Sequence, residues 1–139
     1  MTGHGQTRWG ALALGGLAGV AALVLSVPVL AQGGGLAMLG TLSKGEWTLK
    51  GRGMAADRRI CVKSGAELIQ IMHREGGCSQ FVVEDSPARV TVQYTCPGNG
   101  YARTSIRRET GALVQVESQG IHNGMPFEVT AEARRTGPC

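Results

Sequence analysis

The four cysteines constrain this fold more than any other feature of the sequence. An even number of cysteines in a small exported domain indicates two disulfides. Cys78 and Cys96 stand at equal distances from Pro87, with a β-rich run on each side of a polar turn. A hairpin centred on Pro87 sets these cysteines opposite each other, close enough for a disulfide. This pairing leaves Cys61 for Cys139, and a bridge from Cys61 to Cys78 is the alternative.

The beginning of the chain has the pattern of an export signal. Arg8 and the amino terminus supply positive charge ahead of an uncharged apolar run from Trp9 to Ala31, and no acidic residue appears before Glu46. This order is typical of a secretory signal peptide, and the small residues after Pro28 favour cleavage after Ala31. We therefore expect export by the general secretory route.

The expected domain organisation has three parts: a signal peptide over residues 1–31, a flexible leader over 32–43 and a disulfide-stapled α+β domain over 44–139. We expect a periplasmic protein that contacts the membrane only through the signal segment before cleavage. The alternative is an uncleaved anchor in the inner membrane, with the domain facing the periplasm, because the apolar run is long enough to cross about 30 Å of hydrocarbon. Cleavage removes Arg8 and lowers the net charge from +4 to +3, which is too mild for nucleic-acid binding.

One segment of the domain carries the signals of a helix. Ser64 and Glu67 have the spacing of a capping box, and Gly76 ends the pattern. We expect a helix between them, and His73 near its end is most simply a cation that interacts well with the helix dipole. The apolar residues of this helix are Leu68, Ile69, Ile71 and Met72. Leu68, Ile69 and Met72 are expected to cover the inner face of a sheet.

The rest of the domain has the pattern of an antiparallel sheet. Trp47 and Leu49 alternate with polar residues, as in a half-buried strand, and the segment from Arg58 to Val62 is a second strand candidate. Five further strands are expected near residues 79–85, 89–96, 102–108, 112–119 and 125–135. The predicted fold class is therefore α+β: an antiparallel meander of five to seven strands with one short helix packed on one face and two disulfides.

The turns predict how the last strands pair. A two-residue turn at Asn123 and Gly124 sets Val116 opposite Ala131, and a three-residue loop before Ala112 sets Ile106 opposite Val114. The same face carried to the preceding strand sets Val92 opposite Ile106. The expected inner face consists of Val90, Val92, Tyr94, Ile106, Val114, Val116, Phe127 and Val129.

The hairpin with the two cysteines is harder to place. Its register puts Phe81 and Val83 on the face away from Val92 and Tyr94. We therefore expect either a β-bulge that shifts the register or a first strand that is buried on both sides.

Five arginines converge on one edge of the predicted meander. Arginine binds phosphate and carboxylate groups with paired donors, so this rim is a candidate site for an anionic envelope component or an acidic protein. The alternative is a solvated rim that nearby carboxylates partly neutralise. The arginines of the predicted rim are Arg89, Arg107, Arg108, Arg134 and Arg135.

The sequence contains no motif of a known catalytic or metal site. It has no nucleophile elbow, zinc-protease motif, phosphate loop or C-x-x-C, and His73 and His122 lack the spacing of metal ligands. We therefore expect no cofactor and no metal, and a non-enzymatic binding or interaction module. The alternatives are an enzyme with a cleft between helix and sheet, lined by groups such as Tyr94 or His73, and a structural or inhibitory role through an exposed edge strand.

Several short stretches resemble a known family. They are "GEW" at the tryptophan strand, "CV" leading into "AELIQ", a hairpin that opens with a cysteine and closes in "TCPG", and the terminal "GPC". Together they resemble the domain of unknown function 3617 family, small exported proteins of Gram-negative bacteria, over about the whole mature chain. The resemblance implies a periplasmic address and assigns no catalytic residue or ligand. This chain has "KSGAE" where the family more commonly opens its helix with "TPE".

Overall fold

The computed structural model describes residues 36–139, so the predicted signal peptide and its cleavage site lie outside the described residues. No helix within residues 36–139 is long and apolar enough to span a membrane. The elements in chain order are α1 (Ala37–Gly40), β1 (Gly45–Arg52), β2 (Arg58–Val62), the 3-10 turn η1 (Ala66–Leu68), β3 (Ser79–Asp85), β4 (Arg89–Cys96), β5 (Gly100–Thr110), β6 (Leu113–His122) and β7 (Met125–Gly137).

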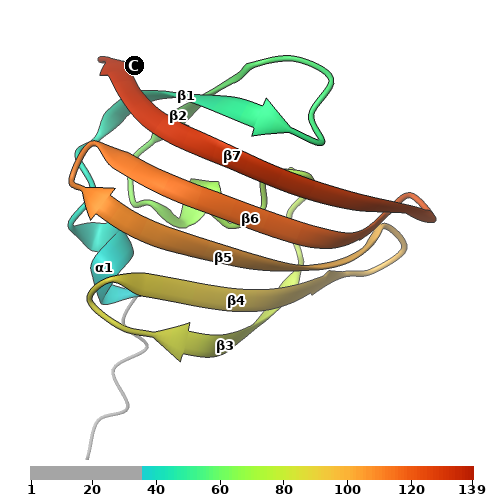
Figure 1. The fold of residues 1–139 in the computed structure, drawn as a ribbon. Helices are drawn as coiled ribbons and strands as arrows, with labels where there is room; N and C mark the ends of the chain where they lie inside the picture. The colour runs from blue at the N-terminus through green and yellow to red at the C-terminus, as the bar shows by residue number, and fades with distance from the viewer. Residues whose placement is uncertain (1–35) are drawn as a thin grey trace, which may run out of the picture. The chain divides into compact units, whose positions relative to one another are not determined.

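All seven strands form one antiparallel sheet with the order β2-β1-β7-β6-β5-β4-β3. Figure 1 shows β3 to β7 as a continuous meander, with β1 added beside β7 and β2 beyond it. The strands β2 and β3 are therefore the two edges of the sheet. The prediction of an antiparallel sheet is confirmed.

The predicted α+β class with a helix on one face is wrong. The structure is nearly all sheet, about 60% strand, and α1 has only four residues. The segment expected as a helix from Ser64 to Gly76 contains only the 3-10 turn η1. Only half of the expected capping box forms. The Glu67 carboxylate accepts hydrogen bonds from the backbone N–H groups of Ser64 and Gly65, but the N-cap of η1 is Gly65, and the Ser64 hydroxyl accepts from the Ala66 N–H.

Tertiary contacts explain why the helix stops after one turn. Carbonyl groups that would accept hydrogen bonds within a helix instead accept them from side chains elsewhere: the Thr104 hydroxyl donates to Ile69 O at 2.8 Å, and the Arg58 guanidinium donates to Ile71 O. Gly65 has a φ of +90°, and a Cβ there would lie 2.6 Å from Leu39 O. Packing against the rest of the domain thus overrides the local helix propensity.

The core is built on the inner face of the sheet. Trp47 and Leu49 of β1 are fully buried, as are the predicted inner-face residues of β4 to β7 except Phe127, which is partly buried. The segment before β1 contributes Met38, Leu39 and Leu42, so the folded unit includes residues expected in the leader. The loop around η1 contributes Leu68, Ile69 and Ile71.

The strand registers are partly as expected. The pairing of β6 with β7 is confirmed, including Val116 opposite Ala131, and Asn123 and Gly124 form the turn with φ values of 50° and 77°. The pairing of β5 with β6 is wrong by two residues, because the register shifts between Arg108 and Thr110 and Ile106 lies opposite Val116. The pairing of β4 with β5 also differs by two residues. A shift of two keeps each side chain on its face, so the predicted inner face survives.

Both expected disulfides are present. Cys78 joins Cys96 across β3 and β4, and Cys61 joins Cys139. The expected bulge is also present, because the register of β3 and β4 shifts between Val82 and Glu84. The alternative that β3 is buried on both sides is wrong, since all its residues are exposed. Two disulfides indicate an oxidising, extracytoplasmic compartment.

Candidate anion-binding site

The sheet divides the five arginines of the predicted rim between its two faces. Residues opposite each other on neighbouring strands share a face. Arg108 lies opposite Val114 and Arg135 lies opposite Trp47, and both partners are buried inner-face residues. These two arginines therefore stand at the end of the inner face. The arginines on the polar outer face are Arg89, Arg107 and Arg134.

Arg89 of β4 and Arg107 of β5 lie directly opposite each other. The Arg108 N–H donates to Ala88 O at 2.8 Å, so Ala88 and Arg108 form a hydrogen-bonded pair of the ladder. The next pair along, Arg89 and Arg107, is then a non-hydrogen-bonded pair, in which the Cα atoms lie only about 4.5 Å apart. The side chains of Arg89 and Arg107 thus extend from Cα atoms that are as close as those of directly opposed residues in a sheet can be.

Carboxylates neutralise this pair only in part. Arg107 forms an ion pair of 2.7 Å with Glu109, two residues along the same strand. Arg89 has no ion pair among residues 36–139. Like charges that lie directly opposite destabilise a sheet, so the pair carries a local electrostatic cost that an anion between the two guanidinium groups would relieve.

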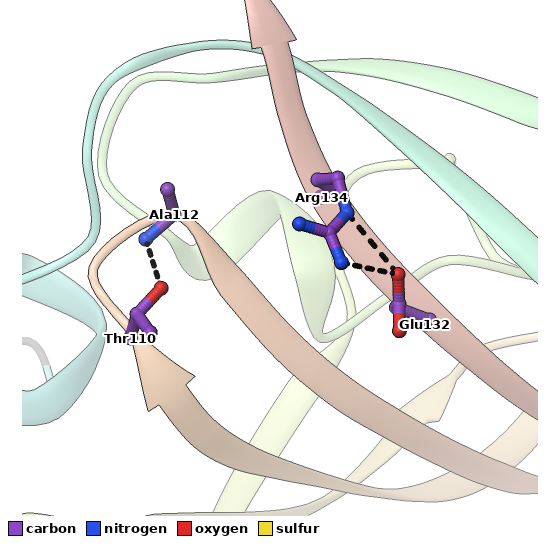
Figure 2. Close-up of polar contacts among 4 residues, drawn as sticks. All are labelled: Thr110, Ala112, Glu132 and Arg134. Carbon is purple, nitrogen blue, oxygen red and sulfur yellow. Dashed lines mark hydrogen bonds and ion pairs between the residues drawn. The ribbon is translucent and has the colours of Figure 1, made fainter.

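The arginines of β7 already have partners. Figure 2 shows the Arg134 guanidinium turned toward Glu132, with Nε and Nη2 donating to the same carboxylate oxygen at 3.2 and 3.1 Å. Arg135 Nε donates to Lys44 O at 2.8 Å. In the same view the Ala112 N–H donates to the Thr110 hydroxyl in the turn between β5 and β6. Arg89 and Arg107 are the two arginines of the rim that lie directly opposite each other, so they are best placed to hold one ligand together.

A polar cavity continues along the outer face. It has a volume of about 310 Å³ and lies over β5, β6 and β7. Arg103 lines it and shares the face of Arg107, four residues away on the same strand. Arg103 is not among the predicted site residues, although strand alternation places it on the same face as Arg107. The other polar residues that line the cavity are Ser105, Glu117, Ser118, Gln119, Glu128 and Thr130.

The two polar groups of the enzyme alternative lie inside the core. His73 is 0% exposed and Tyr94 1% exposed. His73 Nδ1 lies 3.0 Å from the Tyr94 hydroxyl, and Nε2 lies 3.0 Å from Ile121 O. Because a carbonyl oxygen only accepts, a neutral His73 donates from Nε2 and accepts from Tyr94 at Nδ1. The expectation that His73 is a cation at a helix end is wrong, since no helix ends there.

Residues 36–139 contain no group of three or more His, Cys, Asp or Glu side chains placed to hold a metal ion. His122 packs against His73 with ring centroids 4.7 Å apart, and its Nε2 lies 3.1 Å from Asn123 Nδ2. The imidazole nitrogens of His73 are both engaged in hydrogen bonds within the core. These contacts give the two histidines a packing role in the structure.

Burial of Tyr94 predicts a loss of stability in alkali. Burial raises the pKa of Tyr94 to about 12 from an ordinary value of 10.0, against an opposing effect of the Thr104 and Ser118 hydroxyls. The unfolded chain ionises Tyr94 above pH 10 while the folded protein keeps it neutral, so this contribution is complete below pH 10 and is lost as the pH rises to about 12. Urea unfolding across this range should show a shallower decline for Tyr94→Phe than for the unchanged protein. Parallel curves would contradict this assignment.

Comparisons of the chain with known family models, with curated proteins and with solved structures each find no match. The resemblance to the domain of unknown function 3617 family therefore stays a prediction.

Proposed function

We propose that this protein is an exported, non-enzymatic binding module that holds anionic groups between Arg89 and Arg107. The observation that carries the proposal is the direct opposition of these two arginines on the outer face, with no carboxylate paired to Arg89 within residues 36–139. The disulfides support an extracytoplasmic address. The periplasm is the proposed compartment, on the strength of the signal-peptide pattern and of the family resemblance.

The chemistry of the ligand follows from the two guanidinium groups. Each presents a planar fork of N–H donors that matches the oxygens of a phosphate or carboxylate group. An anion between the two side chains interacts with both positive charges and removes their mutual repulsion. The pair is exposed, so each contact is modest and salt weakens it. We therefore expect a ligand that carries several anionic groups. Such a ligand binds several protein molecules at once, or contacts a larger part of the surface of one molecule.

Two sources can present such groups outside the cytoplasm. One is an anionic surface, such as the phosphate headgroups of a membrane. The other is a soluble molecule with phosphate or carboxylate groups. The chemistry at Arg89 and Arg107 is the same for both, and a binding assay with one probe of each kind separates them.

Replacement of both arginines should abolish most of the binding. We expect the double variant Arg89→Ser, Arg107→Ser to bind vesicles of phosphatidylglycerol and phosphatidylcholine at least tenfold more weakly than the unchanged protein, in a sedimentation assay at low salt. Glycerol phosphate, followed by calorimetry, is the soluble probe. Vesicles of phosphatidylcholine alone should bind neither protein.

The matched control removes the same charge from two arginines that lie on opposite faces of β7. The double variant Arg134→Ser, Arg135→Ser should bind both probes within about twofold of the unchanged protein, since these side chains do not face each other and donate to the Glu132 carboxylate and to Lys44 O. Equal losses in the two double variants would mean that net charge alone drives binding. No binding of either probe by the unchanged protein would refute the proposal.

A further inference from the structure

The two edges of the sheet differ in character. The edge strand β2 has five residues, begins with Arg58 and Arg59, and its Cys61 is tied by a disulfide to Cys139. Short, charged edge strands resist pairing with other chains. The edge strand β3 has seven residues, has the sequence "SQFVVED" and contains no Lys, Arg or Pro. Among residues 36–139, no strand pairs with the outer side of β3, so this edge is open to pairing within the described part of the chain.

The open edge also carries the most exposed group of apolar residues among residues 36–139. Phe81 is 70% exposed, Val82 47% and Val83 41%, and the three are consecutive. An exposed edge strand with large apolar side chains is a template for a further strand. A cavity of about 360 Å³ lies on the inner side of this edge, where Gln80 and Val82 meet apolar side chains of Leu36, Leu39 and Ile69.

The geometry of the disulfide shows which backbone groups of β3 are free. The Cα atoms of Cys78 and Cys96 are 4.2 Å apart, the spacing of a non-hydrogen-bonded pair. Pairs alternate along an antiparallel ladder, so Phe81 directs its N–H and C=O toward β4, while Gln80 and Val82 direct theirs away from the sheet. The hydrogen bond from Arg108 N to Ala88 O leads to the same result. It shows that the even-numbered residues of β4 bond to β5, so the odd-numbered residues, which include the partner of Phe81, bond to β3.

The free groups are symmetric about Phe81. The bulge between Val82 and Glu84 breaks the regular pattern beyond Val82, so Gln80 and Val82 are the two regular outward-facing residues. A second copy of β3, antiparallel and related by a two-fold axis at Phe81, sets Gln80 of each copy opposite Val82 of the other. Each such pair exchanges two N–H···O bonds. Phe81 then faces its own copy on the outer face as a close, non-hydrogen-bonded pair.

We propose that β3 is a self-association edge, at which two copies of this chain join their sheets through an antiparallel β3 pair centred on Phe81. The charges are compatible with this arrangement, because the acidic residues Glu84 and Asp85 of the two copies lie at opposite ends of the pair. The isologous contact closes on itself, so it gives a dimer and not a fibre. The second copy is the occupant that we propose, because it presents the same outward-facing Gln80 and Val82 and the same exposed Phe81, so one edge supplies both halves of the contact.

The dimer is a weak one. A single edge-to-edge strand pair buries less surface than a standard interface, and we expect a dissociation constant on the order of 100 µM. This proposal is independent of anion binding, because the contact uses the outward-facing backbone groups of β3 and the Phe81 side chain, and neither Arg89 nor Arg107 takes part in it.

Sedimentation velocity of the oxidised, exported protein over a range of concentrations tests the proposal. We expect a reversible monomer–dimer equilibrium that Phe81→Lys weakens at least tenfold, since it places two like charges face to face. The matched control is Met125→Lys, which makes the same change at a residue that is 69% exposed near the opposite end of the meander. This control should leave the equilibrium unchanged.

A second pair of variants tests the register itself. Phe81→Cys should form a disulfide-linked dimer on mild oxidation, because opposed non-hydrogen-bonded positions suit a disulfide, as Cys78 and Cys96 illustrate. Val83→Cys, which lies in the bulge two residues from the proposed axis, should not. A monomer at every concentration, a dimer that is indifferent to Phe81→Lys, or efficient crosslinking at residue 83 alone would each overturn the proposal.

Discussion

Protein without the disulfide between Cys61 and Cys139 should lose about 4.5 kcal/mol of its free energy of unfolding. The two cysteines are separated by 78 residues, and closing such a long loop removes a large amount of entropy from the unfolded chain. In the folded protein this bridge joins the edge strand β2 to the end of the chain after β7. Its loss frees one edge of the sheet and the carboxyl terminus together.

The second disulfide provides the comparison. Cys78 and Cys96 are only 18 residues apart, so the same argument predicts a smaller loss of about 3 kcal/mol. The variants Cys61→Ala, Cys139→Ala and Cys78→Ala, Cys96→Ala should be compared by urea unfolding at neutral pH. A smaller loss for the longer loop would show that strain or residual structure, and not loop entropy, decides the order.

The sequence predicted the sheet well where a turn defines it. Asn123 and Gly124 permit only a tight two-residue turn, and the β6 and β7 pairing follows from it. The predicted pairing of β5 with β6 was wrong because Gly111 and Ala112 form the turn and Glu109 is an extra residue in a bulge. No residue in "RRETGA" indicates a bulge at that position. The helix prediction failed because the carbonyl groups of Ile69 and Ile71 find partners elsewhere in the domain, and that depends on the complete fold.

The candidate site shows the same division between local and tertiary information. Arg107 and Arg108 are adjacent in a strand and so are Arg134 and Arg135, and adjacent side chains in a strand point to opposite faces. The separation of the predicted rim into two faces therefore follows from the sequence alone. The direct opposition of Arg89 and Arg107 depends on the register of β4 and β5, which the loop between these strands did not define.

Replacement of His73 by leucine should lower the free energy of unfolding by about 3 kcal/mol. Leucine fills much of the space but makes neither of the two hydrogen bonds of the imidazole. The substitution leaves the buried Tyr94 hydroxyl without its acceptor and removes the side-chain donor to Ile121 O. Each unpaired buried group costs about 1–3 kcal/mol. Tyr94→Phe removes only one hydroxyl and should cost about 1 kcal/mol.

A double-mutant cycle separates the hydrogen bond from the packing. His73→Leu combined with Tyr94→Phe removes both partners of the bond, so the double variant should be more stable than the sum of the single losses by about 1 kcal/mol. Additive losses would mean that the 3.0 Å contact contributes nothing and that His73 acts through volume alone. His73→Leu should also leave anion binding at Arg89 and Arg107 unchanged once the protein is folded, because His73 is buried in the core whereas the arginine pair lies on the outer face. Lost binding in a folded His73→Leu variant would connect the buried histidine to function.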